Sequence, residues 1–273
     1  RQDQLDRLAP FGAVDQRLFA RFDRFEHILK LQHVTVMADR RRIGRAAASE
    51  LAALGARVVI VARDPARGAA ARDEIVDETG NREVALEVAD LRSQRQVREL
   101  AARLMAALPE IHVLVNNAGL TLSERRLTED GVEETFAVNH LAPFLLTNLL
   151  LDRLRASAPA RVVTVASAAH RGAAIPFDDL NGERGFSGWL AYSWTKLANI
   201  LFTVELARRL DGSAVTATCL HPGVVATGFA REGPFLIREF QRWAGRLLLL
   251  DPKQGADILV WLASSPEVEG ASG

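Results

Sequence analysis

Short apolar runs alternate with longer amphipathic segments along most of the chain, and this alternation limits the folds that the chain can adopt. The apolar runs predict strands at Val34–Ala38, Arg57–Ala62, Glu83–Val88, Val113–Asn116, Arg161–Ala166 and Val215–Leu220. Helices are predicted near Ile43–Leu54, Ala66–Glu78, Ser93–Leu108, Gly131–Arg155, Gly188–Leu210 and Pro252–Ala263. Strands and helices that alternate at this spacing form βαβ units. The sequence therefore predicts an α/β fold, a single doubly wound domain with a mainly parallel sheet.

A tyrosine and a lysine lie four positions apart in one of the predicted helices. Tyr192 and Lys196 share one helix face, about 5–6 Å apart, where an ammonium group favours the ionised phenol. A free tyrosine titrates near pH ~10, so a nearby cation brings the phenol into the range where it can exchange protons. Ser167 ends a predicted buried strand, at the edge where such sheets place their chemistry. A surface lysine beside a half-buried tyrosine is the alternative interpretation, and the serine at the strand end favours the catalytic one.

Several motifs between about Ile43 and Gly273 belong to one pattern. They are Asn116-Asn117-Ala118-Gly119, Val138-Asn139-His140, Ser167-Ala168-Ala169-His170, Asp178-Asp179-Leu180-Asn181, Tyr192 with Lys196, Leu197-Ala198-Asn199-Ile200-Leu201-Phe202, and His221-Pro222-Gly223-Val224-Val225-Ala226-Thr227. In these motifs the chain resembles the short-chain dehydrogenase/reductase family, and within it the retinol-dehydrogenase-like branch. The resemblance implies a Rossmann-type domain over residues 33–273. It also implies Tyr192 as the general acid/base, Lys196 as its electrostatic partner and ribose ligand, Ser167 as the residue that orients the substrate oxygen, and Asn139 as the support of a proton-relay water.

The first βα turn departs from the family pattern. Where the resemblance implies Thr-Gly-x-x-x-Gly-x-Gly, the chain reads Met37-Ala38-Asp39-Arg40-Arg41-Arg42-Ile43-Gly44 and keeps only the last glycine. Glycines in such a turn let the backbone approach a pyrophosphate, and a side chain at Arg42 obstructs that approach.

Three interpretations of this turn stay open. Arginine side chains replace the missing backbone contacts by bidentate bonds to the phosphates, and Arg42, Ile43 and Gly44 then contact the cofactor. Alternatively, the site no longer binds a dinucleotide. In the third interpretation, residues 1–42 are not a faithful family sequence, for example after a reading-frame disturbance upstream of Ile43.

The other cofactor positions that the resemblance implies are present. Arg63, directly after the second predicted strand, resembles the basic residue that accepts a ribose 2′-phosphate and so favours NADP, although an ordinary solvated arginine is the alternative. Asp90 resembles the aspartate that contacts adenine. The remaining expected contacts are Asn116, Ala118 and Gly119 beside the adenosine half, Pro222, Gly223, Val225 and Thr227 on the nicotinamide side, and Tyr192 and Lys196 themselves. The turn at 116–119 also stabilises the central sheet, so its presence does not by itself require a cofactor.

Composition narrows the possible partners and sites. Lys+Arg and Asp+Glu number 34 each, so no overall charge favours a nucleic-acid partner. The six histidines show no metal-ligand spacing, and no metal is expected. A single cysteine, Cys219, fits a reducing compartment, so a cytoplasmic location is expected. No run of about 18 apolar residues predicts a transmembrane segment.

Two apolar regions predict contacts beyond the core. Residues 1–32 are predicted as an amphipathic N-terminal extension with a helical stripe of Leu18, Phe22, Phe25 and Leu29, which packs on the body of the protein or on a partner subunit; attachment to a membrane surface is the less favoured alternative. The region from Phe229 to Leu250 falls where the family keeps the loop and helices that cover its substrate, which implies a bulky apolar small molecule. The resemblance also implies a homodimer.

These residues lead to one function hypothesis with two alternatives. The first is an NADP-dependent oxidoreductase that interconverts an alcohol and a carbonyl on a bulky apolar substrate. The second is a redox-inactive enzyme that uses Tyr192, Ser167 and Lys196 for isomerisation, cyclisation or dehydration without a dinucleotide. The third is a non-catalytic ligand-binding scaffold, and the presence of all four catalytic positions argues against it.

Overall fold

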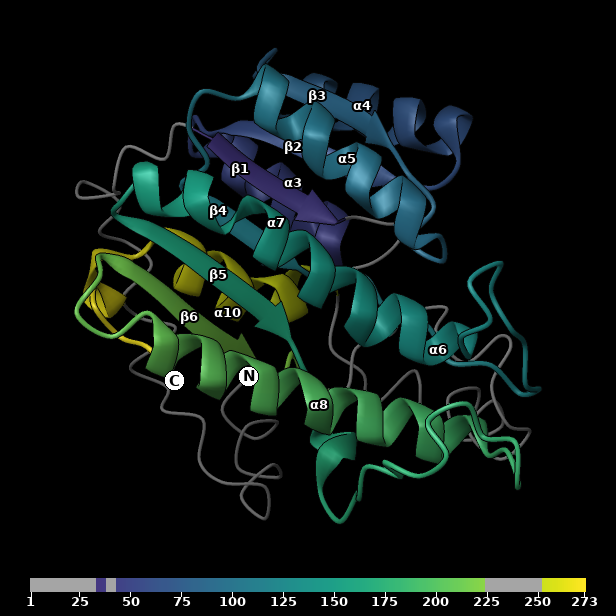
Figure 1. Cartoon of the computed structure of the whole chain (residues 1–273). Helices are drawn as coiled ribbons and strands as arrows, with labels where there is room; N and C mark the ends of the chain where they lie inside the picture. Colours follow the sequence, from purple (N-terminus) through teal and green to yellow (C-terminus); the bar gives the residue numbers. More distant parts are fainter. Residues whose placement is uncertain (1–32, 38–42, 224–251) are drawn as a thin grey trace, which may run out of the picture.

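A six-stranded sheet forms the centre of the molecule (Figure 1). The computed structural model describes residues 33–37, 43–223 and 252–273. The strands are β1 (His33–Met37), β2 (Arg57–Ala62), β3 (Val84–Val88), β4 (Val113–Asn116), β5 (Ala160–Val165) and β6 (Val215–Leu220). Their order is β3-β2-β1-β4-β5-β6, and every neighbouring pair is parallel. The predicted doubly wound α/β fold is confirmed, with the strand order of two mononucleotide-binding halves.

Helices cover both faces of this sheet. On one face lie α3 (Ile43–Ala53), α4 (Pro65–Thr79) and α10 (Pro252–Ser264), and on the other lie α5 (Gln94–Ala107), α7 (Ala142–Ala156) and α8 (Gly188–Arg209). Successive strand residues point to opposite faces, so Val58 and Ile60 join the first core while Val59 and Val61 join the second. Because both faces of the sheet are covered, the inner strands β2, β4 and β5 are buried over nearly their whole length and are mostly apolar.

The ends of the helices follow the local capping chemistry. Asp64 caps α4 by accepting a hydrogen bond from the Arg67 N–H, and Gly80 ends that helix in the left-handed conformation at φ 70°. Ser93 caps α5 in the same manner as Asp64 caps α4. Predicted and observed bounds of these helices differ by one residue at each end.

The predicted helix Gly131–Arg155 is wrong at its start. Gly131 lies in a turn at φ 73°, and the chain then forms α6 (Glu134–Phe136), the π-helix η3 (Ala137–Leu141) and α7. Inside η3 the hydrogen bond runs from the Ala142 N–H to the Ala137 carbonyl, five residues back. Pro143 explains the change of pitch, because its ring clashes with the carbonyl four residues earlier and it has no N–H to donate.

The proposed boundary between an extension and the domain stays a prediction. Residues 1–32 lie outside the described residues, as do Ala38, which was expected to end the first strand, and the apolar region 229–250. The remaining short elements are the 3-10 turns η4 (Ala168–His170) and η6 (Pro266–Val268). Within the described ranges, no helix is both long and apolar enough to cross a membrane.

Candidate active site

The carboxyl ends of the parallel strands collect the residues that the sequence singled out. Arg63 follows β2, Asp90 follows β3, Asn116 ends β4 and Ser167 follows β5. Pro222 and Gly223 follow β6, whose last residue, Leu220, pairs with Val165 of β5. Ligands of such folds bind at this edge, so the strand register alone brings residues far apart in sequence to one site.

Lys196 connects helix α8 to the end of β5. Its Nζ atom donates a hydrogen bond to the Val165 carbonyl at 2.9 Å and lies 5.5 Å from the centre of the Tyr192 ring. The side chain is 3% exposed, and burial lowers its pKa to about 8. The ammonium is therefore close enough to stabilise a phenolate at Tyr192, and it is poised to lose its own proton just above neutral pH.

Tyr192 and Ser167 lie on neighbouring elements. Tyr192 is buried on α8, with the Trp189 ring at 6.1 Å from its own. Ser167 precedes η4, which packs against α8, and its Oγ accepts a hydrogen bond from the Ala169 N–H at 3.2 Å. The backbone carbonyl of Ser167 lies 2.6 Å from His170 Nδ1, so the serine is held from both its side chain and its backbone.

Asn139 is fully buried in η3 and fastens the loop after β4. Its Oδ1 accepts a hydrogen bond from the Leu120 N–H at 2.8 Å, and its Nδ2 donates to the Leu120 carbonyl at 2.9 Å. Nδ2 also lies 3.2 Å from Thr195 Oγ1, whose hydroxyl donates to the Tyr192 carbonyl. The Asn139 side chain thus holds the backbone of the loop after β4 directly and contacts α8 through Thr195. The expected support of a relay water by Asn139 stays a prediction.

Two glycines allow the close approaches that this arrangement needs. A Cβ atom on Gly119 would lie 3.3 Å from Lys196 Nζ and 3.5 Å from Asn139 Oδ1, so a side chain at this position would crowd both groups. At Gly188 a Cβ atom would lie 1.6 Å from the Leu122 carbonyl oxygen, a contact that no side chain can make. Glycine at 188 therefore lets the loop after β4 rest on the first turn of α8.

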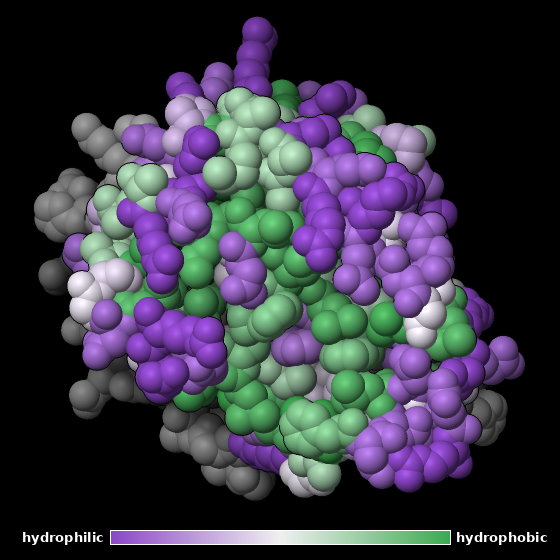
Figure 2. Space-filling view, viewed as in Figure 1, coloured by the Kyte–Doolittle hydropathy of each residue, from purple (hydrophilic) through white to green (hydrophobic). Residues whose placement is uncertain are grey.

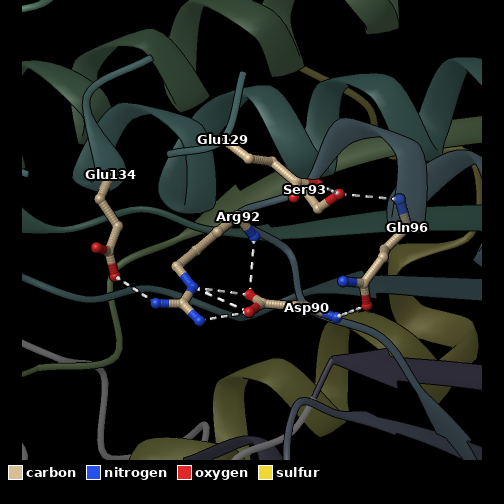
Figure 3. Close-up of polar contacts among 6 residues, drawn as sticks. All are labelled: Asp90, Arg92, Ser93, Gln96, Glu129 and Glu134. Atoms are coloured by element: carbon tan, nitrogen blue, oxygen red, sulfur yellow. Dashed lines mark hydrogen bonds and ion pairs between the residues drawn. The ribbon is translucent and has the colours of Figure 1, made fainter. Parts of the chain in front are cut away.

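At the adenine side of the expected site, Asp90 is held by Arg92 (Figure 3). Arg92 Nε donates to both carboxylate oxygens of Asp90, at 3.0 and 2.9 Å, and its Nη1 lies 3.7 Å from Glu134 Oε1 at the start of α6. Burial acts to raise the pKa of Asp90, but hydrogen bonds from the Arg92 side chain and backbone outweigh it, and the pKa is lowered. Arg63 adds a further favourable charge to Asp90. Asp90 is therefore an ionised acceptor whose charge is largely neutralised within the protein.

The other expected cofactor residues divide between described and undescribed positions. Ile43 and Gly44 are buried in the first turn of α3, Arg63 is exposed, and Ala118 is half-buried beside the α5–α7 core. Asn116 is buried, and its Nδ2 donates to Thr147 Oγ1 at 3.0 Å. This bond joins the end of β4 to α7 and supports a structural role for Asn116. Arg42, Val225 and Thr227 lie outside the described residues.

Sequence reasoning gave no role to Asn199 or Thr195. Both lie on the α8 face that carries Tyr192 and Lys196, since residues three and four positions apart in a helix share a face. Asn199 is 2% exposed and bonds to both Asn139 and His140. The signal that could have found it is its spacing, three residues after Lys196 and seven after Tyr192. Across the described ranges, no cluster of three or more potential metal-ligating side chains occurs.

Comparison with known proteins agrees with this geometry. Residues 32–234 match the model of a family described as short chain dehydrogenase. The chain is 44% identical to human (Homo sapiens) retinol dehydrogenase 14, over 85% of this chain and 73% of that protein, and 41% identical to human retinol dehydrogenase 11, over 88% and 75%.

Two solved structures are similar to this chain over most of its length. A protein from Mycobacterium paratuberculosis is similar at a TM-score of 0.68 and 35% identity, with 86% of this chain and 76% of that chain covered. A short chain dehydrogenase from Burkholderia cenocepacia in complex with NADP is similar at a TM-score of 0.71 and 25% identity, with 89% and 95% covered.

Proposed function

Because the chain belongs to the short chain dehydrogenase family, in its retinol-dehydrogenase-like branch, we propose that it is an NADP-dependent oxidoreductase that interconverts an alcohol and a carbonyl on a bulky apolar substrate. The observation that carries the proposal is the placement of Lys196. Its buried ammonium lies beside the Tyr192 ring, is anchored on the Val165 carbonyl and borders the bare backbone of Gly119. This placement provides a proton donor and its activating cation, with no side chain at 119 to crowd them.

The proton transfer falls to side chains of this chain. When an alcohol is oxidised, Tyr192 as phenolate accepts the hydroxyl proton, and when a carbonyl is reduced, Tyr192 returns a proton to the same oxygen. Lys196 stabilises the phenolate in both directions, because an opposite charge at this distance favours the ionised form. Ser167 orients the substrate oxygen through its hydroxyl. A bound nicotinamide dinucleotide supplies or takes up the hydride at the neighbouring carbon.

The residues around Lys196 fit a dinucleotide. An ammonium has three donors, and the Val165 carbonyl accepts from one of them, so the group has the capacity to donate to ribose hydroxyls as well. Glycine at 119 keeps a side chain from crowding the ammonium. Asp90 is ionised and partly buried, as an acceptor for the adenine amine has to be.

Two observations favour NADP over NAD. Arg63 is exposed directly after β2, the position from which a side chain reaches the ribose 2′-phosphate. The similar dehydrogenase from Burkholderia cenocepacia is in complex with NADP. The three arginines of the first βα turn provide further positive charge for phosphate groups.

The substrate class follows from the relatives and from exposed apolar side chains. The relatives are named retinol dehydrogenases, and retinol is a long apolar alcohol. Trp189 and Leu190 at the start of α8 are exposed, and Trp189 lies beside the Tyr192 ring. An apolar alcohol of the retinoid type therefore has apolar side chains close to the proposed proton donor.

We further propose that two copies associate through α7 and α8. Figure 2 shows apolar residues gathered over the face that these helices form. Leu201, Val204 and Phe144 lie on it, with 51%, 49% and 43% of their side chains exposed. A patch of large exposed apolar side chains is typical of an interaction surface.

A cytoplasmic location is also part of the proposal. Its support is the single cysteine, which fits a reducing compartment.

Ligand binding and turnover together test the proposed function. Titration with NADPH and with NADH, followed by the fluorescence of the four tryptophans, should give saturation with a clear preference for NADPH. Reduction of all-trans-retinal by NADPH, followed by the loss of NADPH absorbance, should then be measurable. Saturable binding without turnover of retinal would support the cofactor and count against a retinoid as the substrate. Absence of both binding and turnover would overturn the proposal.

A further inference from the structure

The π-helix η3 leaves one backbone carbonyl next to the proposed site without its usual helical donor. In a regular helix the Asn139 carbonyl would accept from residue 143, but residue 143 is proline and has no N–H. Asn199 of α8 supplies the missing donor, with its Nδ2 at 2.9 Å from the Asn139 carbonyl oxygen. A side chain 60 residues further along the chain thus completes the hydrogen bonding of η3.

The other end of the Asn199 amide fixes His140. Since Nδ2 faces the Asn139 carbonyl, Oδ1 is the atom that lies 2.9 Å from His140 Nδ1, and a carbonyl oxygen can only accept. His140 therefore carries its proton on Nδ1. Burial lowers the pKa of His140 and outweighs the hydrogen bond to Asn199, so the imidazole is neutral at neutral pH. The ring is enclosed by Phe136, Phe144 and Phe202.

These contacts lead from Asn199 to the proposed catalytic lysine through Asn139 and the backbone at Gly119 and Leu120. Asn139, whose carbonyl Asn199 holds, binds the backbone of Leu120 through both atoms of its amide. Leu120 follows Gly119, which lies so close to Lys196 that an added Cβ would be 3.3 Å from Nζ. Asn199 and Lys196 both belong to α8, so this series of contacts begins and ends on the same helix. If Asn199 is lost, the Asn139 carbonyl and His140 Nδ1 stay buried without these partners, and η3 has to rearrange to satisfy them.

We propose that Asn199 is a positioning residue for proton transfer, which acts through Asn139 and Gly119 to keep the Lys196 ammonium beside Tyr192. It touches neither substrate nor dinucleotide. The inference rests on the proposed function of Tyr192 and Lys196, and it adds a residue that supports the placement of the ammonium.

The composition of the chain offers a direct test that needs no substrate. Tyr192 is the single tyrosine, so the ultraviolet absorbance of ionised phenol reports the titration of that residue alone. Asn199→Ala should raise the midpoint of this titration by roughly 0.5–1 pH unit, because part of the influence of the neighbouring cation is lost. Asn81→Ala is the matched control: Asn81 also holds backbone carbonyls with its Nδ2, those of Ala52 and Ala56 at 2.8 and 2.9 Å, at the opposite edge of the sheet. It should leave the midpoint unchanged.

A second measurement uses turnover. With all-trans-retinal and NADPH, Asn199→Ala should lower kcat by roughly 10- to 100-fold, as expected for a small displacement of a catalytic group, with KM for retinal changed by less than about threefold. Asn81→Ala should match the parent in kcat per folded molecule, with circular dichroism and Tm as the measure of folding. If Asn199→Ala does not fold, Asn199→Ser, which keeps a donor hydroxyl, should show a smaller shift in the same direction.

The two measurements separate the possible failures. An unchanged Tyr192 midpoint in folded Asn199→Ala would overturn the positioning role, whatever the turnover. A raised midpoint in a chain that turns over no retinal would keep the positioning role and count against the proposed function. Equal losses of activity in Asn199→Ala and Asn81→Ala would reduce the effect to general destabilisation and also overturn the inference.

Discussion

The Nζ atom of Lys196 lies 2.9 Å from the backbone carbonyl of Val165, so a charged side chain of α8 is fastened to the last residue of β5. Ser167 follows two residues later on the same strand exit, and Tyr192 precedes Lys196 by one helical turn. This hydrogen bond therefore links the two elements that carry the proposed catalytic residues. Burial of the ammonium lowers its pKa to about 8.

Replacement of Tyr192 by phenylalanine should remove the proton donor and little else. The ring of Tyr192 is buried and keeps most of its packing in Tyr192→Phe. General acid/base participation contributes about 10²–10⁴-fold to rate, so kcat for retinal reduction should fall within that range. Thermal unfolding should change by no more than the loss of one hydrogen bond, about 1 kcal/mol. Turnover equal to that of the parent would show that Tyr192 is not the acid/base.

The buried ammonium of Lys196 should make the free energy of unfolding depend on pH. Its folded pKa of about 8 lies below the ~10.4 of an unfolded lysine, so between these values the unfolded chain binds more protons. The free energy of unfolding therefore rises with pH across this window, and below about pH 8 the full cost of burying the charge remains.

Lys196→Met has a similar length and no charge, so it should lack this rise. In a Tyr192→Phe background, which removes the phenol's own titration, the lysine protein should gain up to about 3 kcal/mol over the methionine protein between about pH 7 and 10.5. Urea unfolding at a series of pH values measures the difference. Parallel pH dependence of the two proteins would contradict a depressed lysine pKa.

Arg92 should support the preference for NADP. In Arg92→Ala the Asp90 carboxylate loses its main partner and interacts more strongly with Arg63, which then competes with the 2′-phosphate for that arginine. Because an exposed ion pair contributes about 0.2–1 kcal/mol, the affinity for NADPH should fall roughly 1.5- to 5-fold, and the affinity for NADH should change less. Arg95→Ala is the control, since Arg95 pairs with Glu99 on the exposed face of α5. An equal change for both dinucleotides would contradict this role.

Salt should reveal whether arginines replace the missing glycines of the first βα turn. If they do, NADPH binding should weaken steeply as salt rises, because exposed charge pairs are screened. Arg42→Gly should still bind, with a shallower dependence on salt, since a glycine restores the backbone route to the phosphates. Fluorescence titration at several salt concentrations measures both effects. Binding that is tight and insensitive to salt would contradict the arginine explanation.

An acidic residue in the α7–α8 face should separate the proposed dimer. Leu201 is half-exposed on that face, and Leu201→Glu would place a charge in the middle of an apolar contact. Light scattering should give the mass of two chains for the parent and of one chain for the variant. Leu127→Glu, at a comparably exposed leucine on neither helix, should remain a dimer. If the parent protein has the mass of one chain at every concentration, the proposed dimer is wrong.

The sequence by itself determined most elements of the fold and singled out the proposed catalytic positions. Apolar runs such as Val58–Val61 fix buried strands because the pattern is local, and the order of strands and helices then leaves few topologies open. Tyr192, Lys196 and Ser167 could be singled out for the same reason, since helical spacing and a strand end are readable from neighbouring residues.

Only the tertiary structure decided how distant residues complete the site. The Asn139 carbonyl in the π-helix accepts from an asparagine 60 residues away, Arg92 lies beside Glu134 at the start of α6, and Gly188 is required by the carbonyl of Leu122. These contacts join segments that are far apart in sequence, and the partner of each buried polar group is chosen by packing and by the need to satisfy its hydrogen bonds. Local sequence patterns therefore do not predict which partner each buried polar group takes.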